Sequence, residues 1–572
     1  MKRTSQVLVL VMVMGGAIFV RDPLFAKPDG QSILKTPAEE NGYTRYTQND
    51  ALTAFLSALD EASKDVSVSI VGRSLPTDAY GAQDISLVLI SKNGAMGPGG
   101  LDRAKPTVLF TAAQHGNEQS AKEAVIRLIR DLALGDLHPL LDKVNVVAMP
   151  QTNPYGNFMN VRTNELDLDM NRDHIKIEAE GVRAIHRVFM AYRPEVTIDV
   201  HEKGDDYYRV SIGCVSNVNI GRDLQDFSRN VLLAEVEKSL AKKRVAFHEY
   251  LVTEDLGVDT SSGAAYASGP SGPREEMKRY STTDINDGRN SLGIFETLSF
   301  IQEGASRHDL ETLAERTAWQ FQGLRSFLES VAGHGPDIQK MVHGDRERLL
   351  QRAAARAASD PVHLRMKFAR DPKEPELHLK AFGTVESPIR GILKVDKKAG
   401  DTLLASDVTP TRAPGGQKIV DEVVKNWFPN VEPTLSVARP HGYIIPSSRL
   451  DIVETLLALG VEVGLVTKGG LADAEVYEVN AIVPAQLDYL APDTIDLTAR
   501  PIQAPVKKGD FYIDCVQPAA NLIPLLLEPQ SEFGLIRYWK FKLVPEAGGI
   551  FEILRFVGPA APAVIPYKPW RP

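Results

Sequence analysis

The chain has 572 residues, of which 43% are hydrophobic and 24% are charged, and its 65 basic and 74 acidic residues give a net charge of −9. This composition is typical of a globular protein and argues against a disordered one. The acidic balance argues against a nucleic-acid partner, which usually requires a basic face. The length predicts two or three domains.

The N-terminus is typical of a secretory signal sequence. Lys2 and Arg3 precede an apolar segment over residues 7–20, and residues 24–26, Leu-Phe-Ala, offer a cleavage site. We therefore predict a signal peptide over residues 1–26 and an exported protein, periplasmic or extracellular, with no stable membrane span after cleavage. An uncleaved anchor is the alternative, although the apolar segment is short for a span.

Apolar strands and amphipathic helices alternate through the first half of the chain. Residues 107–112 form a continuous apolar run, as in a strand that is buried on both faces of a sheet. The alternation predicts an α/β domain over residues 40–335. Strands are predicted at residues 67–71, 85–90, 107–112, 144–149, 196–200 and 292–295, and helices at 43–59, after 118, at 183–192, 224–243 and 310–331.

The pattern changes after residue 335. Basic helical sequence predicts a linker helix over residues 336–362, and short strand-like runs predict a smaller, strand-rich α+β domain over residues 363–572. Its predicted strands are at residues 377–380, 391–395, 442–445 and 511–513, with a helix at 451–459. The two cysteines, Cys214 and Cys515, lack metal-site spacing, so we expect ordinary buried thiols, with a single bridge as the alternative.

Two histidines and a carboxylate follow the ends of apolar strands. His115 and Glu118 lie three residues apart after the run 107–112, and His201 ends the run 196–200. Because ligands of open α/β sheets bind beyond the carboxyl ends of strands, we expect these side chains to converge. Two histidines and one glutamate form a ligand set of catalytic zinc, with a fourth position for water. The sequence thus predicts one zinc ion per chain and a metallohydrolase, although another divalent metal is possible.

A further glutamate is a candidate general base. Glu296 follows the apolar run 292–295, so it is expected at the same edge of the sheet, where it could take a proton from water and return it to a leaving amine. Glu303 is the competitor, and its polar neighbours predict a solvated side chain. The preceding stretch, residues 259–290, is rich in Ser, Gly and Pro and predicts a wall or lid of the crevice.

Three segments between His115 and His201 resemble the zinc carboxypeptidase family. Residues 153–156 are Asn-Pro-Tyr-Gly, residues 162–164 are Arg-Thr-Asn, and residues 169–172 are Asp-Met-Asn-Arg. They match, in order, the family's Asn-Pro-Asp-Gly element, its arginine and its Asp-Leu-Asn-Arg element, with tyrosine in place of the first aspartate. The resemblance covers about residues 43–331 and implies an α/β fold with a mixed, mostly parallel sheet flanked by helices.

The resemblance also implies a role for each motif residue. Arg162 corresponds to the arginine that stabilises the oxyanion of the tetrahedral intermediate. Asn171 and Arg172 correspond to the pair that grips the terminal carboxylate of the substrate. Asp169 corresponds to the carboxylate that orients the first histidine ligand. The family's mobile tyrosine is best matched by Tyr280, with Tyr266 as the second candidate.

We therefore expect a zinc metallocarboxypeptidase that acts on C-terminal amide bonds of peptides or of peptidoglycan stems. Two alternatives remain. One is a deacylase of the aspartoacylase and succinylglutamate-desuccinylase type. These enzymes share His-Gly-Asn-Glu and Asp-Leu-Asn-Arg elements, and they release acyl groups from amino acids. A non-catalytic protein that binds peptides through a degenerate site is the other. The sequence predicts neither the residue removed nor an oligomeric state.

Overall fold

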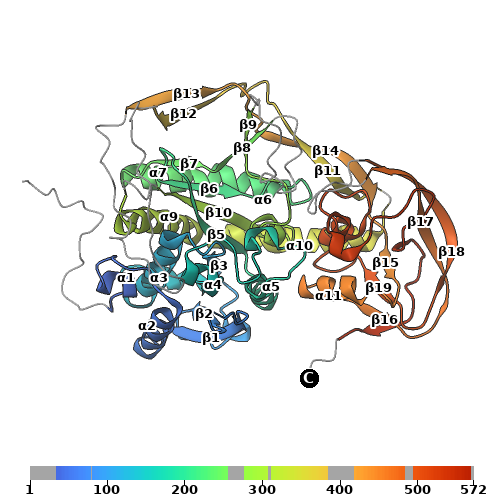
Figure 1. The fold of residues 1–572 in the computed structure, drawn as a ribbon, viewed down its shortest axis with the longest axis horizontal. Helices are drawn as coiled ribbons and strands as arrows, with labels where there is room; N and C mark the ends of the chain where they lie inside the picture. Colours follow the sequence, from blue (N-terminus) through green and yellow to red (C-terminus); the bar gives the residue numbers. More distant parts are fainter. Residues whose placement is uncertain are drawn as a thin grey trace, which may run out of the picture. The chain divides into compact units, whose positions relative to one another are not determined.

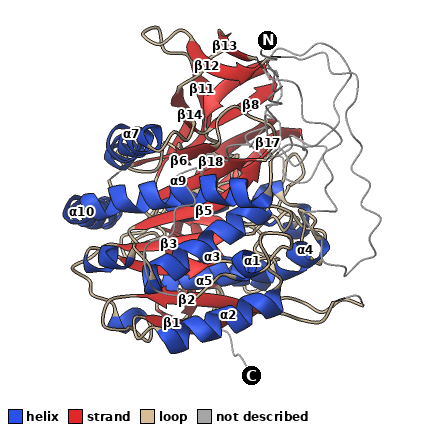
Figure 2. Cartoon of the chain, turned by 90° about the vertical axis from the view of Figure 1, so that its left-hand side faces the viewer, coloured by secondary structure: helices blue, strands red, loops and turns tan. Residues whose placement is uncertain are grey.

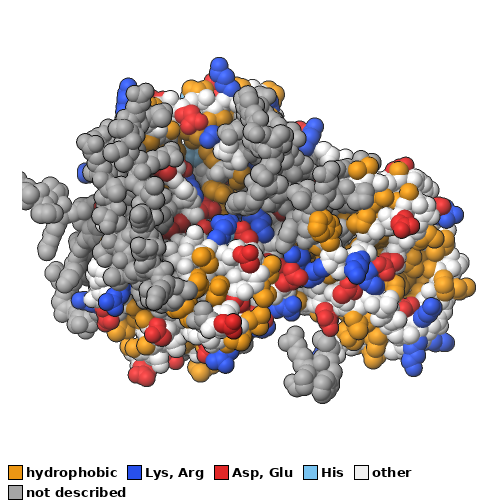
Figure 3. All heavy atoms as spheres, in the orientation of Figure 1, with side chains coloured by type: hydrophobic (Ala, Val, Ile, Leu, Met, Phe, Trp, Pro, Cys, Tyr) orange, Lys and Arg blue, Asp and Glu red, His pale blue; other side chains and the backbone are white. Residues whose placement is uncertain are grey.

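The computed structural model describes residues 34–572 apart from positions 79, 256–275, 307–310, 358, 384–417, 484–493 and 569–572. The predicted signal sequence and the strand predicted over residues 391–395 lie outside the described residues. Within the described part of the chain, no helix is both long and apolar enough to cross a membrane. Basic and acidic side chains are interspersed over the face drawn in Figure 3.

A mixed eight-stranded sheet organises the first part of the chain (Figure 1). Its order is β1-β2-β4-β3-β5-β10-β6-β7; the central strands β4, β3, β5 and β10 run parallel, and β1, β2 and β6 pair antiparallel with their inner neighbours. This confirms the predicted fold class. The strands are β1 (Val66–Arg73), β2 (Asp84–Ile90), β3 (Thr107–Ala112), β4 (Asn145–Met149), β5 (Val196–Lys203), β6 (Val210–Cys214), β7 (Phe247–Glu249) and β10 (Leu298–Ala305), and the separate hairpin is β8 (Leu251–Asp255) with β9 (Glu276–Tyr280).

Helices flank the sheet (Figure 2). Helix α3 packs against α9 over one face, and α5 packs on β1 and β3. The apolar face of α3 and the buried strands explain the alternation in the sequence. The helices are α1 (Pro37–Glu40), α2 (Asn49–Ala62), α3 (Gln119–Leu134), α4 (Pro154–Met159), α5 (Glu180–Tyr192), α6 (Arg222–Phe227), α7 (Ala234–Lys242), α8 (Asn290–Gly293), α9 (Leu313–Gly333) and α10 (Gly335–Ala355), with a π-helical segment at Ser228–Leu233 between α6 and α7.

Successive side chains of β5 and β10 point to opposite faces of the sheet. On one face, Glu202 pairs with Arg316 of α9 at 2.7 Å, and Phe300 lies against Phe327 of α9 with ring centroids 4.8 Å apart. His201 directly precedes Glu202 on β5 and therefore faces away from α9. The face that carries His201 is the one on which the candidate site forms.

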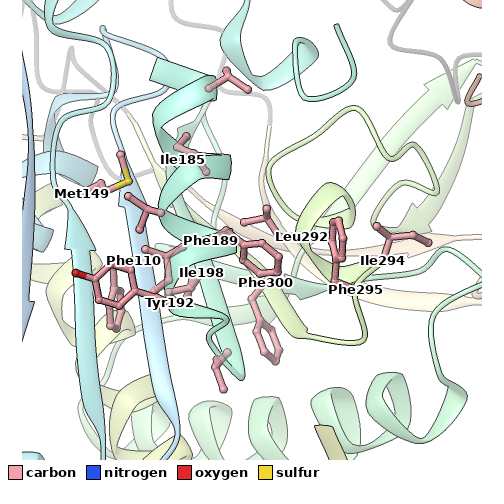
Figure 4. Close-up of a cluster of buried hydrophobic side chains, with 14 of the residues drawn as sticks. Phe110, Met149, Ile185, Phe189, Tyr192, Ile198, Leu292, Ile294, Phe295 and Phe300 are labelled. Atoms are coloured by element: carbon pink, nitrogen blue, oxygen red, sulfur yellow. The ribbon is translucent and has the colours of Figure 1, made fainter. Parts of the chain in front are cut away.

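The strand predicted over residues 292–295 is wrong. Residues 290–293 form the short helix α8, and the strand next to β5 is β10, which begins only at Leu298. Figure 4 shows Leu292, Ile294 and Phe295 within the hydrophobic core, where Phe295 packs on Phe189 of α5 at 5.5 Å between ring centroids. A short apolar run is buried in either conformation, so its hydrophobicity does not distinguish a helix from a strand.

The C-terminal part of the chain is rich in strands. A seven-stranded sheet has the order β18-β17-β20-β15-β19-β16-β21, and β11 pairs with β14 and β12 with β13. Cys214 and Cys515 are both buried and free, as expected for ordinary core residues. The elements are β11 (Pro361–Ala369), β12 (Leu377–Phe382), β13 (Ile419–Val424), β14 (Asn430–Ala438), β15 (Gly442–Ile445), α11 (Leu450–Ala458), β16 (Gly464–Val466), β17 (Gly470–Val483), β18 (Thr494–Val506), β19 (Phe511–Asp514), α12 (Leu522–Leu527), β20 (Leu554–Phe556) and β21 (Val564–Pro566).

Candidate metal centre and active site

His115 and Glu118 lie in the turn between β3 and α3. Glu118 immediately precedes the first residue of α3, so its carboxylate sits at the amino end of the helix. Gly116 packs directly on Gly156 of the Asn-Pro-Tyr-Gly element, and a Cβ on Gly116 would lie 1.9 Å from the Gly156 carbonyl carbon. Asn153 of the same element donates from Nδ2 to the carbonyl of Gln114 at 3.0 Å. The first motif thus fixes the backbone that carries two of the predicted ligands.

The three predicted ligands converge on one point. Glu118 Oε1 lies 2.7 Å from His115 Nδ1, and Glu118 Oε2 lies 2.7 Å from His201 Nδ1. The two Nδ1 atoms are 3.1 Å apart. All three side chains are buried, and one ligand atom from each lies within 4.8 Å of the others, so the cluster could hold one metal ion. The structure therefore brings together His115, Glu118 and His201 through their Nδ1 and carboxylate atoms.

The outward nitrogens of both histidines are held by aspartates. His115 Nε2 lies 3.0 Å from Asp169 Oδ1, as the resemblance implied, and His201 Nε2 lies 2.6 Å from Asp199 Oδ2. A carboxylate on Nε2 keeps the proton there and leaves Nδ1 as a lone-pair donor, which is the arrangement of metal-binding histidines. Two imidazole nitrogens and a carboxylate suit zinc. Asp199 was not singled out in the sequence, although its spacing of two from His201 puts both on one face of β5.

Charge also favours a cation at this point. Burial would raise the pKa of Glu118, but the histidines on both sides lower it well below its usual range. Burial would lower the pKa of His201, but the carboxylates of Asp199 and Glu118 raise it well above its ordinary value. Together with Asp169, three carboxylates surround two imidazoles, so a divalent cation would offset a local excess of negative charge.

We expect Asp199→Asn to weaken zinc affinity by about 10- to 100-fold, because an amide cannot accept the His201 Nε2 proton as strongly as a carboxylate. Competition with a chelator of known affinity measures this change. Asp360→Asn, which alters a buried carboxylate paired with Arg439 in the C-terminal part, is the control and should leave zinc affinity unchanged. Equal affinity for wild type and Asp199→Asn would contradict the orienting role.

Arg162 lies beside the ligand cluster. Its Nε donates to Asp169 Oδ2 at 2.9 Å, and its Nη1 is 3.6 Å from Glu118 Oε1. About a third of the side chain is exposed, so the guanidinium borders the cluster while it remains accessible. Asn171 is buried, with Nδ2 3.5 Å from His201 Nε2, and Arg172 donates from Nη1 to the Asn171 carbonyl at 2.7 Å. The structure thus gathers the predicted carboxylate-binding residues on the His201 side of the sheet.

Glu303, not Glu296, lies beside the ligands. In the parallel pair β5–β10, Glu303 is the register partner of His201, so both side chains emerge at the same level and on the same face. Glu303 is 7% exposed, and its Oε2 has no hydrogen-bond partner among the described residues. Burial raises the pKa of Glu303, and the carboxylate of Glu118 adds to that increase. The prediction that Glu303 is solvated is wrong, because β10 carries its polar residues into the buried centre of the sheet.

Glu296 lies at the opposite end of β10. It precedes Leu298, and the five residue-to-residue steps from Leu298 to Glu303 span about 16 Å of parallel strand. Its Oε2 accepts the Gly221 N–H at 2.8 Å, and its Oε1 accepts Asn521 Nδ2–H at 3.1 Å. The structure therefore does not bring Glu296 to the ligand cluster. Glu296 instead joins the strand end to the C-terminal part of the chain.

The environment of Glu296 predicts a pH-dependent stability. Burial raises its pKa to about 7, with a further increase from Asp345. Because this value lies above that of the unfolded chain, the stabilising contribution of the protonated group is complete below about pH 4.5 and is lost as the pH rises through 7. Relative to Glu296→Gln, which mimics the protonated acid, the wild-type free energy of unfolding should fall by on the order of 3 kcal/mol between pH 4.5 and 8.

Urea denaturation of both proteins at several pH values checks this expectation. A constant difference between wild type and Glu296→Gln across the range would show that Glu296 does not titrate between the folded and unfolded states in this interval.

The predicted tyrosine does not contact the cluster in the structure. Tyr280 ends β9, where its ring packs edge-on against Trp427 at 4.5 Å and under the guanidinium of Arg229 at 3.9 Å. Burial raises the pKa of Tyr280 to about 12. A different tyrosine, Tyr250, follows β7, is partly buried, and lies within the electrostatic influence of Glu303. No spacing rule in the sequence distinguishes these two tyrosines.

Comparisons with known proteins find similarity to carboxypeptidases. Residues 52–195 match the family model described as zinc carboxypeptidase. The chain is 22% identical over 454 residues to carboxypeptidase 2 of Trichophyton rubrum, covering 76% of this chain and 74% of the relative. It is 24% identical over 456 residues to the protein named probable carboxypeptidase 2 of Trichophyton verrucosum, covering 75% of each. The segment matched by the family model, residues 52–195, contains His115, Glu118 and the three motifs that resemble the family.

Two solved structures are also similar. A metallo-carboxypeptidase from Burkholderia cenocepacia gives a TM-score of 0.38 at 18% identity, covering 50% of this chain and 69% of that one. A metallo-carboxypeptidase from Pseudomonas aeruginosa, in complex with (2-guanidinoethylmercapto)succinic acid, gives 0.36 at 19% identity, covering 50% and 68%.

Proposed function

We infer that this chain, which belongs to the zinc carboxypeptidase family by the match of its residues 52–195, releases the C-terminal residue of peptides with Glu303 as the general base. The observation that carries this proposal is the register of His201 with Glu303, which puts a buried carboxylate beside the ligand cluster. The family match supports a zinc-dependent hydrolase of peptide bonds. The choice of Glu303 as the general base rests on the strand register alone.

The chain's own groups divide the reaction between them. When bound by His115, Glu118 and His201, zinc supplies the Lewis acidity that makes water nucleophilic at neutral pH and polarises a carbonyl. Glu303 takes the proton of the attacking water on Oε2, which has no hydrogen-bond partner within the described part of the chain, and returns it to the nitrogen of the leaving residue. Arg162 stabilises the negative charge that develops on the carbonyl oxygen.

The substrate is oriented through its free C-terminal carboxylate. Asn171 lies next to His201, and Arg172 donates to the Asn171 carbonyl; together they offer an amide and a guanidinium, which suit a carboxylate. Because this grip requires a terminal carboxylate, it selects the last peptide bond of a chain. The N-terminal sequence supports an exported enzyme, periplasmic or extracellular, and for that reason we include cell-wall stem peptides among its substrates.

The proposal is tested with one peptide in two forms. We expect the zinc-loaded protein to release the last residue from a peptide with a free C-terminus and to leave the C-terminally amidated peptide intact, measured by mass spectrometry. A panel of N-acyl amino acids separates the deacylase alternative. Hydrolysis of the N-acyl amino acids without hydrolysis of peptides would replace the carboxypeptidase by a deacylase, and binding of the peptide without hydrolysis would identify a binding protein.

A further inference from the structure

A buried arginine near the active site has unused hydrogen-bond donors. Arg289 lies just before α8 and is only 2% exposed. Its Nη2 donates to Asp287 Oδ2 at 3.0 Å, whereas Nε and Nη1 have no hydrogen-bond partner among the described residues. Unpaired donors on a buried cation are costly, and they are uncommon in folded proteins. The position therefore needs an explanation beyond packing.

The segment that carries this arginine is attached to the carboxylate-binding residues. The backbone N–H of Gly288 donates to Asn171 Oδ1 at 2.7 Å, and Asn286 Nδ2 donates to the carbonyl of Arg172 at 2.7 Å. Gly288 also lies against Asp199, because a Cβ at this glycine would approach Asp199 Oδ2 to 2.6 Å. The segment is thus fixed between the predicted grip for the substrate and the aspartate that holds His201.

The guanidinium faces a glycine on the neighbouring strand. A Cβ on Gly213 would lie 3.4 Å from Arg289 Nη1 and 2.9 Å from Tyr250 Cβ, so a larger residue would crowd the front of the arginine. Gly213 pairs with Ile301, two residues before Glu303 on β10. Two strand residues span about 7 Å, and they share one face of the sheet. The arginine therefore lies on the same face of the sheet as Glu303, about two residues, or about 7 Å, closer to the amino end of β10.

We propose that Arg289 selects an acidic side chain on the C-terminal residue of the substrate, a specificity that rests on the carboxypeptidase function proposed above. Asn171 and Arg172 take the terminal carboxylate, which leaves Arg289 as a second cation farther along β10. The separation of about 7 Å between Arg289 and Glu303 along β10 suits the short side chain of glutamate or aspartate. Guanidinium donors bind a carboxylate through short, charge-assisted hydrogen bonds.

Asp287 explains how the arginine is tolerated without substrate. Its carboxylate neutralises the guanidinium through Nη2 and also accepts the backbone N–H groups of Arg289 and Asn290 at 3.0 and 2.6 Å. Because the Asp287 carboxylate also accepts these backbone N–H groups, it pairs with Nη2 of Arg289 and leaves Nε and Nη1 of Arg289 for a ligand. A structural role alone would be expected to use these donors on nearby carbonyl groups, as Arg346 does at the other end of β10.

The test compares peptides that differ only in the last residue: Glu, its uncharged isostere Gln, and Leu. For the zinc-loaded wild type we expect kcat/KM for the Glu peptide to exceed that for the Gln peptide by at least about 10-fold. In Arg289→Gln the Glu peptide should lose about 30-fold, whereas the Gln and Leu peptides should change by less than about threefold. Arg289→Lys should keep part of the preference, and Arg439→Gln, a buried arginine of the C-terminal part, should keep all of it.

Binding of the products gives a readout that does not require turnover. Calorimetric titration of the wild type should show tighter binding of free glutamate than of glutamine, and Arg289→Gln should remove the difference. An equal loss for all three peptides in Arg289→Gln, or a wild type that prefers Gln or Leu, would overturn the assignment while leaving the carboxypeptidase function intact. A zinc-loaded protein that cleaves none of the peptides would overturn both.

Discussion

Glu303→Gln should lower kcat for peptide hydrolysis by about 10³-fold, with zinc content unchanged. The carboxylate is the register partner of His201, and glutamine keeps its shape while it can neither take nor return a proton. Because Glu303 is not among the three ligands that converge at Nδ1 and carboxylate atoms, the metal should remain bound. Steady-state kinetics with a free-carboxylate peptide, together with metal analysis by mass spectrometry, measures both quantities.

Glu296→Gln is the matched control for this experiment. It makes the same chemical change in a buried glutamate of the same segment, but at the other end of β10, where the side chain bonds to Gly221 and Asn521. We expect its kcat to stay within about threefold of the wild type. The reverse result, a large loss in Glu296→Gln and little change in Glu303→Gln, would refute the assignment of the base to β10 beside His201.

The metal ligands could be predicted from the sequence because two simple rules agree on them. Apolar runs end at His115 and His201, and the carboxyl ends of parallel strands meet at one edge of a sheet. The spacing of three between His115 and Glu118 then adds a carboxylate from the turn that follows the same strand. The structure brings these residues to within hydrogen-bond distance of one another.

The general base could not be predicted by the same rules. Strand β10 contains Ser299, Gln302 and Glu303, and all three are buried. Gln302 donates from Nε2 to Gln320 Oε1 of α9 at 2.6 Å, and Ser299 Oγ accepts from Thr197 Oγ1 at 2.6 Å, which are tertiary contacts that no local pattern reveals. A hydrophobicity pattern therefore favours the apolar run before β10, which in the structure is a core-packed helix and turn.

The C-terminal part shows a similar limit. The long hairpin of β17 and β18 was not predicted, although both strands alternate apolar and polar residues, and β18 contains Pro501 and Pro505. Proline disfavours a strand prediction, but it is tolerated where a strand lies at the edge of a sheet, and β18 is the edge strand of its sheet. Edge position is a tertiary property that the sequence pattern does not contain.

His115→Ala should reduce zinc from about one ion per chain to almost none and lower peptide hydrolysis by more than about 10³-fold. The loss removes one of three ligands and also leaves Asp169 without its histidine partner. Because a metal that binds only the folded state stabilises it, zinc added to the metal-free wild type should raise Tm, and the same addition to His115→Ala should not. Mass spectrometry, kinetics and a thermal scan measure the three effects.

The thermal response separates loss of the metal from loss of the fold. His343→Ala removes a half-exposed histidine that pairs with Glu195, and it should keep zinc, activity and the Tm response. If His115→Ala kept one zinc ion, the metal would have to bind elsewhere, and Glu303 would lose its role beside it. If His115→Ala lost zinc but kept its hydrolysis, the reaction would not depend on this cluster. Only the joint loss, with a folded protein, ties the hydrolysis to the two Nδ1 atoms and the Glu118 carboxylate.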